Sequence, residues 1–466
     1  MAASPSHTHN TVTSSYRPSI SQTLSLWGYS SLLALLIPFA FLNLLLRAVI
    51  RHKDYNARRF ERFGFVPAPP QQGGLLVHCV SVGEVTALTP LLKWLQKNNP
   101  ELPLTVTTTT PTGSKRLRDT FGDAVHHFYL PYDLHMAMHG MLKRIQPSKV
   151  LIAEVELWPN LVHACWKHNI PVYQVNGRLT DRATQRYKKL AALFVPMMKK
   201  ISGVCAQSQR DATNYLTLGL NPNKLTLCGN MKFDVPKPTS SSEIANALAR
   251  IEDIAKGKRV LMAGSTHSAD EKVLLPAFKE LGKRYPELML IIAPRKIQRA
   301  ERLQLRATKA GFSVQRLSTL SPERAADILI IDSLGLLAQA YSLASIAVVG
   351  GSFANKGGHN PLEACAHGVP VIMGPNTDNL VGVRETLEQA KALTIVADSH
   401  QLYKKIDTLL TDDKQRLSHC LAGKDVMEKN RGALEKTLEA INSTSATAAC
   451  ISPANHSTSP IGKKTG

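Results

Sequence analysis

Short apolar runs alternate with longer amphipathic segments along most of this chain. From Leu75 onward the runs are rich in Val, Ile and Leu, and the segments between them are long enough to form helices. This alternation is typical of βα units built around parallel sheets. The candidate strands are 75–80, 104–109, 150–153, 172–175, 203–206 and 225–228, followed by 259–263, 288–293, 328–331, 345–349, 369–373 and 393–396.

A polar segment between two groups of these runs marks a predicted domain boundary. Residues 236–242 are rich in Pro, Ser and Thr and are typical of a linker. The sequence therefore predicts an α/β protein with two doubly wound, Rossmann-like domains, 47–235 and 236–443, that face a cleft. The Ser- and Thr-rich ends of the chain, 1–23 and 444–466, are predicted to be disordered.

One apolar run is much longer than the others. Residues 24–46 carry no charge. Their number is enough for a helix to cross the core of a bilayer, which takes about 20 residues. A cleaved signal peptide is the alternative, but the run is too long for one and its basic residues follow it. Because the cations Arg47, Arg51, Lys53, Arg58, Arg59 and Arg62 come after the run, the rest of the chain is predicted to be cytoplasmic, with 24–46 as a single-pass transmembrane anchor.

The amino-acid composition indicates which classes of binding partner are favoured. The chain has 56 Lys and Arg against 35 Asp and Glu, a formal charge of +21 that favours an anionic partner. The cations are scattered and aromatic residues make up only 6% of the chain, so a nucleic acid is the weakest candidate. The seven cysteines form no CxxC pair, which argues for a reducing compartment and against a structural zinc site.

The segment 350–364 is the most informative about function. It follows a predicted strand, contains Gly350, Gly351, Gly357 and Gly358, and leads into a predicted helix start at Asn360-Pro361. Glycines allow a ligand to approach the backbone, and free N–H groups at a helix start attract anions. The simpler interpretation is a capping box between Asn360 and Glu363.

The ends of the first-domain strands carry carboxylates and hydroxyls. Glu84 follows the first strand and is either a general base or the second half of a capping box with Ser81. The hydroxyl-rich loop 107–114 either binds a sugar or phosphate or caps the helix that follows it, and capping is the favoured interpretation. Glu154 and Glu156 follow the strand 150–153 and would share one face if that strand continued, so that each carboxylate raises the pKa of the other. Lys232 lies where the first domain ends.

Strand ends of the second domain offer hydroxyls, cations and glycines on one edge. Three predicted strands end in turns at 264–267, 293–296 and 332–336, and Arg295 is suited to bidentate anion binding. Each turn alone is unremarkable, but with the glycine-rich segment they converge on one anion site. The chain contains no Walker A lysine motif, no GxGxxG after the first strand and no GxSxG elbow.

Together these motifs resemble the bacterial Kdo (3-deoxy-D-manno-octulosonic acid) transferases, in the same order along roughly 42–438. The matching segments are 81–84, 109–114, 156–160, 232–234 and 357–364. The resemblance implies a GT-B fold, a membrane anchor, and transfer of Kdo from CMP-Kdo to the lipid A precursor lipid IVA on the cytoplasmic face of the inner membrane. Anionic lipids of that membrane would be a further partner of the basic chain.

The resemblance also implies residue roles. Glu84 matches the general base, and Glu154 and Lys232 match positions that stabilise the transition state. The donor site would be formed by Ser265, Thr266, His267, Pro294, Arg295, Leu334, Gly335, Leu336, Gly357, Gly358, His359, Asn360, Pro361, Leu362 and Glu363. The chain departs from the family at Lys296, Leu336 and Asn376, where His, Glu and His are common.

Two alternatives remain open at this point. One is a GT-B transferase that uses a UDP-sugar and another lipid acceptor, and the other is a membrane-tethered scaffold that keeps an inactive transferase fold. The sequence contains no evident metal-binding cluster, so we expect catalysis without a metal or other cofactor.

Overall fold

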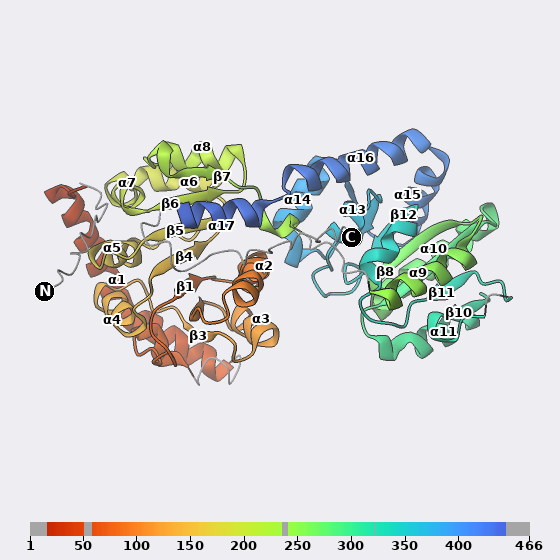
Figure 1. Cartoon of the computed structure of the whole chain (residues 1–466), viewed down its shortest axis with the longest axis horizontal. Coiled ribbons are helices and arrows are strands. Elements are labelled where there is room, and N and C mark those ends of the chain that lie inside the picture. Colours follow the sequence, from red (N-terminus) through yellow and green to blue (C-terminus); the bar gives the residue numbers. More distant parts are fainter. Residues whose placement is uncertain (1–15, 51–57, 235–240, 322, 444–466) are drawn as a thin grey trace, which may run out of the picture. The chain divides into compact units, whose positions relative to one another are not determined.

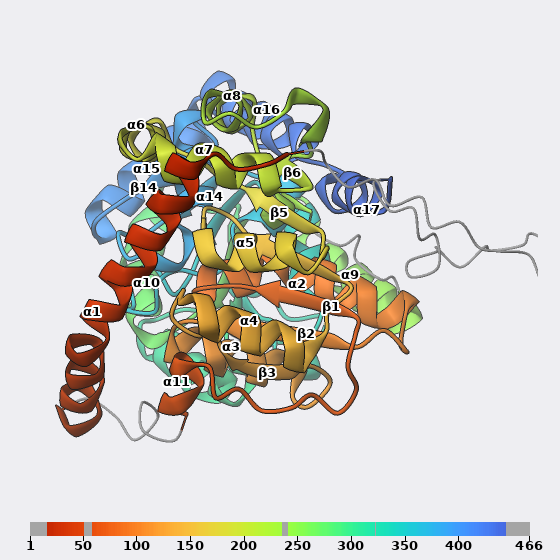
Figure 2. The same ribbon diagram turned by 90° about the vertical axis from the view of Figure 1, so that its left-hand side faces the viewer.

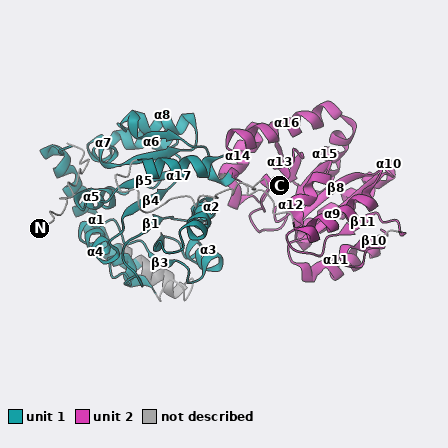
Figure 3. Ribbon diagram, in the orientation of Figure 1, with its two compact units in different colours: residues 1–232, 432–466 teal, residues 233–431 magenta. Residues whose placement is uncertain are grey.

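The computed structural model describes residues 16–50, 58–234, 241–321 and 323–443. These residues form two compact units, Met1–Lys232 with Gly432–Gly466 (unit 1) and Phe233–Arg431 (unit 2), as Figure 3 shows. Most of the predicted linker, the predicted disordered tail 444–466, residues 1–15 of the predicted disordered segment 1–23 and the middle of the basic cluster lie outside the described residues. The prediction of disorder is wrong for residues 20–23, which form the first turn of a helix.

Unit 1 is built on a seven-stranded parallel sheet with the order β3-β2-β1-β4-β5-β6-β7 (Figure 1). The chain order reverses between β1 and β4, which makes these two neighbours the switch point of the sheet. The strands are β1 Leu75–His78, β2 Leu104–Thr108, β3 His126–Tyr129, β4 Lys149–Ala153, β5 Val172–Gly177, β6 Gly203–Ala206 and β7 Leu225–Leu227.

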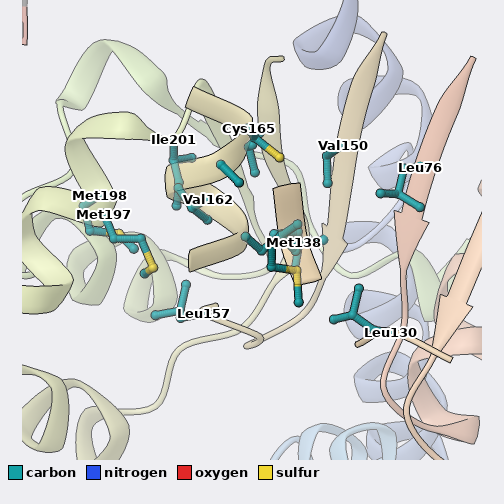
Figure 4. Close-up of a cluster of buried hydrophobic side chains, with 14 of the residues drawn as sticks. Leu76, Leu130, Met138, Val150, Leu157, Val162, Cys165, Met197, Met198 and Ile201 are labelled. Atoms are coloured by element: carbon teal, nitrogen blue, oxygen red, sulfur yellow. The ribbon is translucent and has the colours of Figure 1, made fainter. Parts of the chain in front are cut away.

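Helices cover both faces of this sheet because its strands are apolar on both sides. Leu76 packs with α4, α5 and α7 in the cluster drawn in Figure 4, whereas its neighbours Leu75 and Val77 pack with α2, α3 and α17 on the opposite face. The helices of unit 1 are α1 Ile20–Ile50, α2 Val82–Asn98, α3 Pro111–Phe121, α4 His135–Ile145, α5 Pro159–Lys167, α6 Asp181–Lys189, α7 Ala191–Lys200, α8 Gln209–Thr217 and α17 Ala433–Ser443.

Unit 2 repeats this architecture with the strand order β10-β11-β9-β8-β12-β13-β14. Its switch point lies between β8 and β12. The strands are β8 Arg259–Thr266, β9 Leu288–Pro294, β10 Val314–Arg316, β11 Ile328–Ile330, β12 Ile346–Val349, β13 Val371–Met373 and β14 Leu393–Ile395. The helices are α9 Ser242–Ala255, α10 Ser268–Arg284, α11 Ala300–Lys309, α12 Leu337–Ala340, α13 Leu362–Ala366, α14 Val381–Gln389, α15 Ser399–Thr411 and α16 Asp413–Lys429.

The predicted domain boundary is wrong at its C-terminal end. The sequence pattern assigns 236–443 to the second domain, but α17 belongs to unit 1. Leu438 and Ile441 of this helix are buried in the core of unit 1, and Lys149 donates a hydrogen bond to the carbonyl of Ile441 at 2.8 Å. The apolar face of α17 fits the sheet of unit 1, although the chain passes through unit 2 to reach it.

The long apolar run forms α1, which extends beyond the predicted 24–46 at both ends. Within it, Ile20–Phe39 is long and apolar enough to cross a membrane, with a mean hydropathy of 1.3. Pro38 lies inside the helix. By length and composition alone, α1 is a candidate for membrane association.

Candidate active site

The carboxylates singled out in unit 1 flank the switch point of its sheet. Glu84 lies in the first turn of α2, directly after β1, and Glu154 directly follows β4. Since β1 and β4 are hydrogen-bonded neighbours, both residues stand at the same edge of the sheet. Ligands of open α/β sheets bind at this position.

Glu84 is almost fully buried, with 7% of its surface exposed. Its Oε2 accepts a short hydrogen bond from the N–H of Val80, and its Oε1 has only a 3.4 Å contact with Ser81 Oγ. The predicted capping box does not form, because Ser81 makes no side-chain cap. Burial raises the pKa of Glu84 to about 8, and the charges of Glu156 and Glu154 act in the same direction. A carboxyl group with a pKa near neutrality is suited to proton transfer.

Glu154 is paired with Lys232. Lys232 Nζ lies 2.7 Å from Glu154 Oε1, and both side chains are mostly buried. The strand ends at Ala153, as predicted, so the condition under which Glu154 and Glu156 would share one face of a strand is not met, and Glu154 adopts a left-handed φ of +49°. Such a backbone is costly for a residue other than glycine and is concentrated at functional sites. Burial, followed by the charge of Glu154, raises the pKa of Glu156.

Contacts that the sequence did not reveal hold Glu154 in place. The carbonyl of Glu154 accepts hydrogen bonds from Gln174 Nε2 at 2.7 Å and from Tyr215 Oη at 3.2 Å. Asn176 also has a left-handed backbone, and its Oδ1 accepts from the N–H of Met231, which precedes Lys232. Polar residues inside the apolar strand β5 were the available signal for Gln174 and Asn176.

Several buried polar atoms at this edge of the sheet have no hydrogen-bond partner among the described residues. They are Nε2 of His78, Oγ1 of Thr108 and Nδ2 of Asn176, from β1, β2 and β5. Burial lowers the pKa of His78 to about 3, so its ring is neutral at physiological pH. Unpaired buried polar groups are costly, so these atoms mark the carboxyl ends of β1, β2 and β5 as a place where polarity is kept at the expense of stability.

The hydroxyl-rich loop after β2 caps a helix, as the sequence predicts. Thr110 is the N-cap of α3, and its Oγ1 accepts from the N–H of Gly113 at 3.1 Å. Ser114 is buried and bonded to His127 Nε2 at 2.8 Å. These hydroxyls are used by the protein itself.

In unit 2 the two segments at the switch point contact each other. His267 follows β8, His359 lies in the glycine-rich segment after β12, and their Nε2 atoms are 2.8 Å apart. Ser265 has a left-handed φ of +55° beside a bulge in β8. Burial, then the charge of Arg295, lowers the pKa of His359 to about 4, and burial also lowers the pKa of His267.

Asp270 joins the same two segments and was missed by the sequence analysis. It is buried and accepts hydrogen bonds from the backbone N–H groups of His267, Gly351, Phe353 and Ala354. One carboxylate thereby fixes both the start of α10 and the glycine-rich turn. Its position three residues after His267 was a visible signal for the first contact, but nothing in the sequence indicates the other three.

The predicted capping box at Asn360 is also wrong. Helix α13 starts at Leu362, and Asn360 Oδ1 accepts from the N–H of that residue at 3.1 Å. The Glu363 carboxylate instead receives a 3.4 Å contact from the Asn360 side-chain amide. Burial raises the pKa of Glu363 above its ordinary value, although the hydrogen bond from Asn360 and the charge of Arg295 partly oppose this shift. Gly357 and Gly358 have left-handed φ values of +75° and +77°.

The remaining predicted donor-site residues divide into two groups. Arg295 is exposed and follows Pro294 at the end of β9, where its N–H bonds the carbonyl of Thr266. Leu336 and Leu362 are buried in the core of unit 2, and Leu334 is 83% exposed. Of 334–336, the exposed side chain of Leu334 and the backbone at Gly335, whose φ is +80°, are therefore open to a ligand, whereas the Leu336 side chain is not.

Comparisons with known proteins agree with this geometry. Residues 57–235 match the model of the 3-deoxy-D-manno-octulosonic-acid transferase (kdotransferase) family, and residues 253–420 match glycosyl transferases group 1. The 3-deoxy-D-manno-octulosonic acid transferase of Haemophilus influenzae is 36% identical over 88% of this chain and 96% of its own length. The chain belongs to the Kdo transferase family.

A second relative points the same way. The 3-deoxy-D-manno-octulosonic acid transferase of Bordetella pertussis is 30% identical over 82% of this chain and 90% of its own length. Among solved structures, the C-terminal CMP-Kdo binding domain of WaaA from Acinetobacter baumannii aligns with 40% of this chain and 100% of its own, at 22% identity and a TM-score of 0.37. The two family models and the two curated relatives show that the protein is a glycosyltransferase, and the two parallel sheets confirm the predicted GT-B fold class.

Proposed function

We propose that this Kdo transferase moves Kdo from CMP-Kdo to lipid IVA with inversion at the anomeric carbon, and that Glu84 is the general base. The observation that carries the proposal is the burial of Glu84 at the switch point of unit 1, with a pKa of about 8. One or more Kdo units would be added in lipopolysaccharide core biosynthesis.

The reaction needs one base and one anion site. The acceptor hydroxyl gives its proton to the Glu84 carboxylate while its oxygen forms the new bond to the anomeric carbon of Kdo. The bond from that carbon to the phosphate oxygen breaks, and CMP leaves with the electron pair. The Lys232–Glu154 pair, at 2.7 Å, would stabilise charge that develops in the transition state.

Unit 2 would bind the nucleotide sugar. Arg295, His267 and His359 interact electrostatically after the ends of β9, β8 and β12. Arg295 would provide the fixed positive charge that the departing phosphate requires. The family departures at Lys296, Leu336 and Asn376 leave this group unchanged.

A membrane location agrees with the charge and with α1. We place the enzyme on the cytoplasmic face of the bacterial inner membrane, where its net charge of +21 favours a phosphorylated acceptor and anionic lipids. Each basic residue near such a surface contributes about 1 kcal/mol of attraction. A nucleic acid is not needed to account for the charge.

The direct test is product analysis. Purified enzyme is incubated with CMP-Kdo and lipid IVA, and mass spectrometry should show the acceptor mass increased by one or more Kdo units. Glu84→Gln should lower turnover by about 100-fold or more, while the variant still unfolds in a cooperative thermal transition. Glu101→Gln, at an exposed position, is the matched control and should behave as wild type. Undiminished turnover in Glu84→Gln would refute the base.

Two further measurements separate the alternatives. Binding of CMP and UDP is compared by calorimetry, and a preference for UDP would favour a transferase with another donor. A chain that binds anionic membranes but produces no Kdo-containing lipid under any condition would instead be a scaffold with an inactive fold.

A further inference from the structure

The faces of helix α1 differ in polarity and in burial. Positions three or four residues apart are half-buried and form one stripe, which includes most of the polar residues of its first half. The stripe consists of Gln22, Ser25, Leu26, Tyr29, Ser30, Leu33 and Ile37. Large apolar side chains on the remaining surface are 37% to 81% exposed, namely Ile20, Leu24, Trp27, Leu32, Leu35, Leu36, Phe39, Phe41 and Leu42.

Polar groups of the stripe are hydrogen-bonded to unit 1. Tyr29 Oη donates to Asp133 Oδ2 at 3.1 Å, and Ser30 Oγ lies 3.1 Å from Asn160 Oδ1. Asp133 and Asn160 are both buried. Trp27 stacks on His135 with ring centroids 5.8 Å apart. The first half of α1 is therefore docked on the globular part of unit 1, and Figure 2 shows it beginning beside α7 and running past α5.

Contacts with unit 1 continue on both sides of this region. Before the helix starts, the ring of Tyr16 lies 5.4 Å from Lys199 Nζ at the end of α7. Farther along the helix, the rings of Phe41 and Phe63 are 5.7 Å apart. The helix thus lies along the surface of unit 1 and does not project away from it.

These contacts conflict with a perpendicular span. If residues 24–46 filled the bilayer core with unit 1 in the cytoplasm, Tyr29 would lie about 26 Å from the cytoplasmic end of the span, at 1.5 Å per residue. Asp133 and Asn160 would then have to lie near the far leaflet, and so would the buried start of α5. Hydrocarbon at that depth excludes such polar backbone and side chains.

We propose that α1 lies along the cytoplasmic interface of the membrane as a monotopic helix. The stripe faces unit 1, and the exposed apolar side chains enter the lipid. This inference builds on the membrane location in the proposed function and replaces the single-pass topology that the sequence predicts.

Neighbouring residues of unit 1 fit a lipid surface. Met136, next to His135, is 86% exposed, although a methionine of this kind is normally buried. The exposed Lys199 lies near the end of α7, close to the start of α1, where it can meet anionic headgroups. The same surface thus offers an apolar side chain for the acyl region and a cation for the headgroups.

The residues that contact α1 are also connected to the part of unit 1 that is proposed to bind the acceptor. Asp133, the partner of Tyr29, accepts from the N–H groups of Asn160 and Leu161 at 2.9 and 2.8 Å. These groups open α5, which directly follows the segment that carries Glu154. A helix held in the interface would therefore position this edge of the sheet at the membrane surface, where a lipid acceptor is found.

Labelling of cysteines in membranes tests the topology. The full chain is made with Cys420→Ser and Cys450→Ser, because the other five cysteines are buried. Ser21→Cys is compared with Ser443→Cys, both at exposed positions, using a membrane-impermeant maleimide. Neither should react in intact spheroplasts, and both should react after detergent. Labelling of Ser21→Cys alone in spheroplasts would place the start of α1 in the periplasm and overturn the inference.

A crosslink in native membranes provides a second measurement. Trp27→Cys with His135→Cys should be joined by a short bis-maleimide, as detected by mass spectrometry. Leu35→Cys with His135→Cys is the control, because Leu35 is 72% exposed and lies eight residues, about 12 Å, farther along the helix than Trp27. Absence of the first crosslink, when each cysteine reacts in detergent, would also overturn the inference. Neither readout depends on Kdo transfer, so an inactive enzyme with this topology would fail only the proposed function.

Discussion

Lys232 Nζ lies 2.7 Å from Glu154 Oε1, with 19% and 13% of the two side chains exposed. The pair connects the last residue of the first segment of unit 1 to the turn that ends β4. Glu154 holds a left-handed backbone there, and its carbonyl is fixed by Gln174 and Tyr215. Since several contacts maintain one strained residue, the position of its carboxylate matters more than local stability.

We expect Lys232→Met to lower kcat by about 100-fold, the typical effect of removing one group that stabilises transition-state charge. Steady-state kinetics with CMP-Kdo as the varied substrate measure the effect. Lys189→Met removes an exposed lysine of α6 and should leave kcat unchanged. If Lys232→Met lowered only the melting temperature, the ion pair would be purely structural.

The sequence predicts the central strands of both sheets and misses an edge strand in each. β3 contains His126 and His127, and β10 contains Gln315 and Arg316, so neither has the apolar pattern of a strand that is covered on both faces. At the other edges, the short strands β7 and β14 do follow apolar patterns and are predicted. Edge strands make fewer contacts, and the pattern that they require is correspondingly weaker.

The site residues that the sequence predicts lie next to recognisable strands. Glu84, Glu154 and His267 are visible because each directly follows a strand that is easy to recognise. Asp270 is not visible as a loop organiser, because three of its four backbone partners lie about 80 residues away in the chain. Contacts between distant segments depend on strand order, which local patterns do not encode. For the same reason, the return of α17 to unit 1 could not be predicted.

The raised pKa of Glu84 predicts a pH dependence of activity. The base must be deprotonated, and burial raises its pKa to about 8. We therefore expect kcat/KM to rise with pH and to level off above about pH 8. Glu156→Gln is a useful companion variant, because the charge of Glu156 helps to raise the pKa of Glu84. Its removal should move the rising part of the pH profile to lower pH. A profile that is flat from about pH 6 to pH 9 would contradict the assignment.

Stability should change with pH in the opposite direction. Between the ordinary value of 4.5 and the folded value of about 8, folded Glu84 binds more protons than unfolded Glu84. The free energy of unfolding contributed by this group therefore falls as the pH rises through that window. Glu84→Gln should be more stable relative to wild type at about pH 9 than at about pH 5. Thermal melts of both proteins at each pH measure this difference, and a constant difference would contradict the raised pKa.

Asp270 should act as a positioning residue for the donor. Asp270→Asn keeps the size of the side chain but replaces one acceptor oxygen by an NH2 group that faces backbone N–H donors. An unsatisfied buried group costs about 1–3 kcal/mol, so we expect KM for CMP-Kdo to rise by about tenfold. The control is Asp398→Asn, an exposed N-cap of α15 where Asn is equally favourable. A lower melting temperature with unchanged KM would limit Asp270 to a structural role.

Catalysis is expected to proceed without a metal ion. No group of three or more His, Cys, Asp or Glu side chains in the described part of the chain is arranged to hold one. Arg295 and Lys232 would provide the positive charge that a metal supplies in other transferases. Turnover should therefore be unchanged after dialysis against EDTA. Activity that is lost in EDTA and restored by a divalent cation would contradict this expectation.

Gly350 is the position where the glycine-rich segment should be least tolerant of a side chain. A Cβ there would lie 2.6 Å from the carbonyl oxygen of Ser265 and 2.7 Å from the Cα of Thr266. Both are backbone atoms of the neighbouring strand β8, so neither can rotate away. Gly350→Ala must push apart the two segments that hold His267 and His359, and we expect it to cost about 1–3 kcal/mol of stability and to weaken CMP-Kdo binding.

Gly282→Ala is the matched control for this substitution. Gly282 lies inside α10, and a Cβ there would meet nothing within 4 Å. Replacing a helical glycine with alanine removes an entropic cost, so this variant should gain about 0.5–1 kcal/mol. Chemical denaturation and CMP-Kdo titration of the two variants measure both effects. If Gly350→Ala bound CMP-Kdo with wild-type affinity, close contact between β8 and the glycine-rich segment would not be required for donor binding.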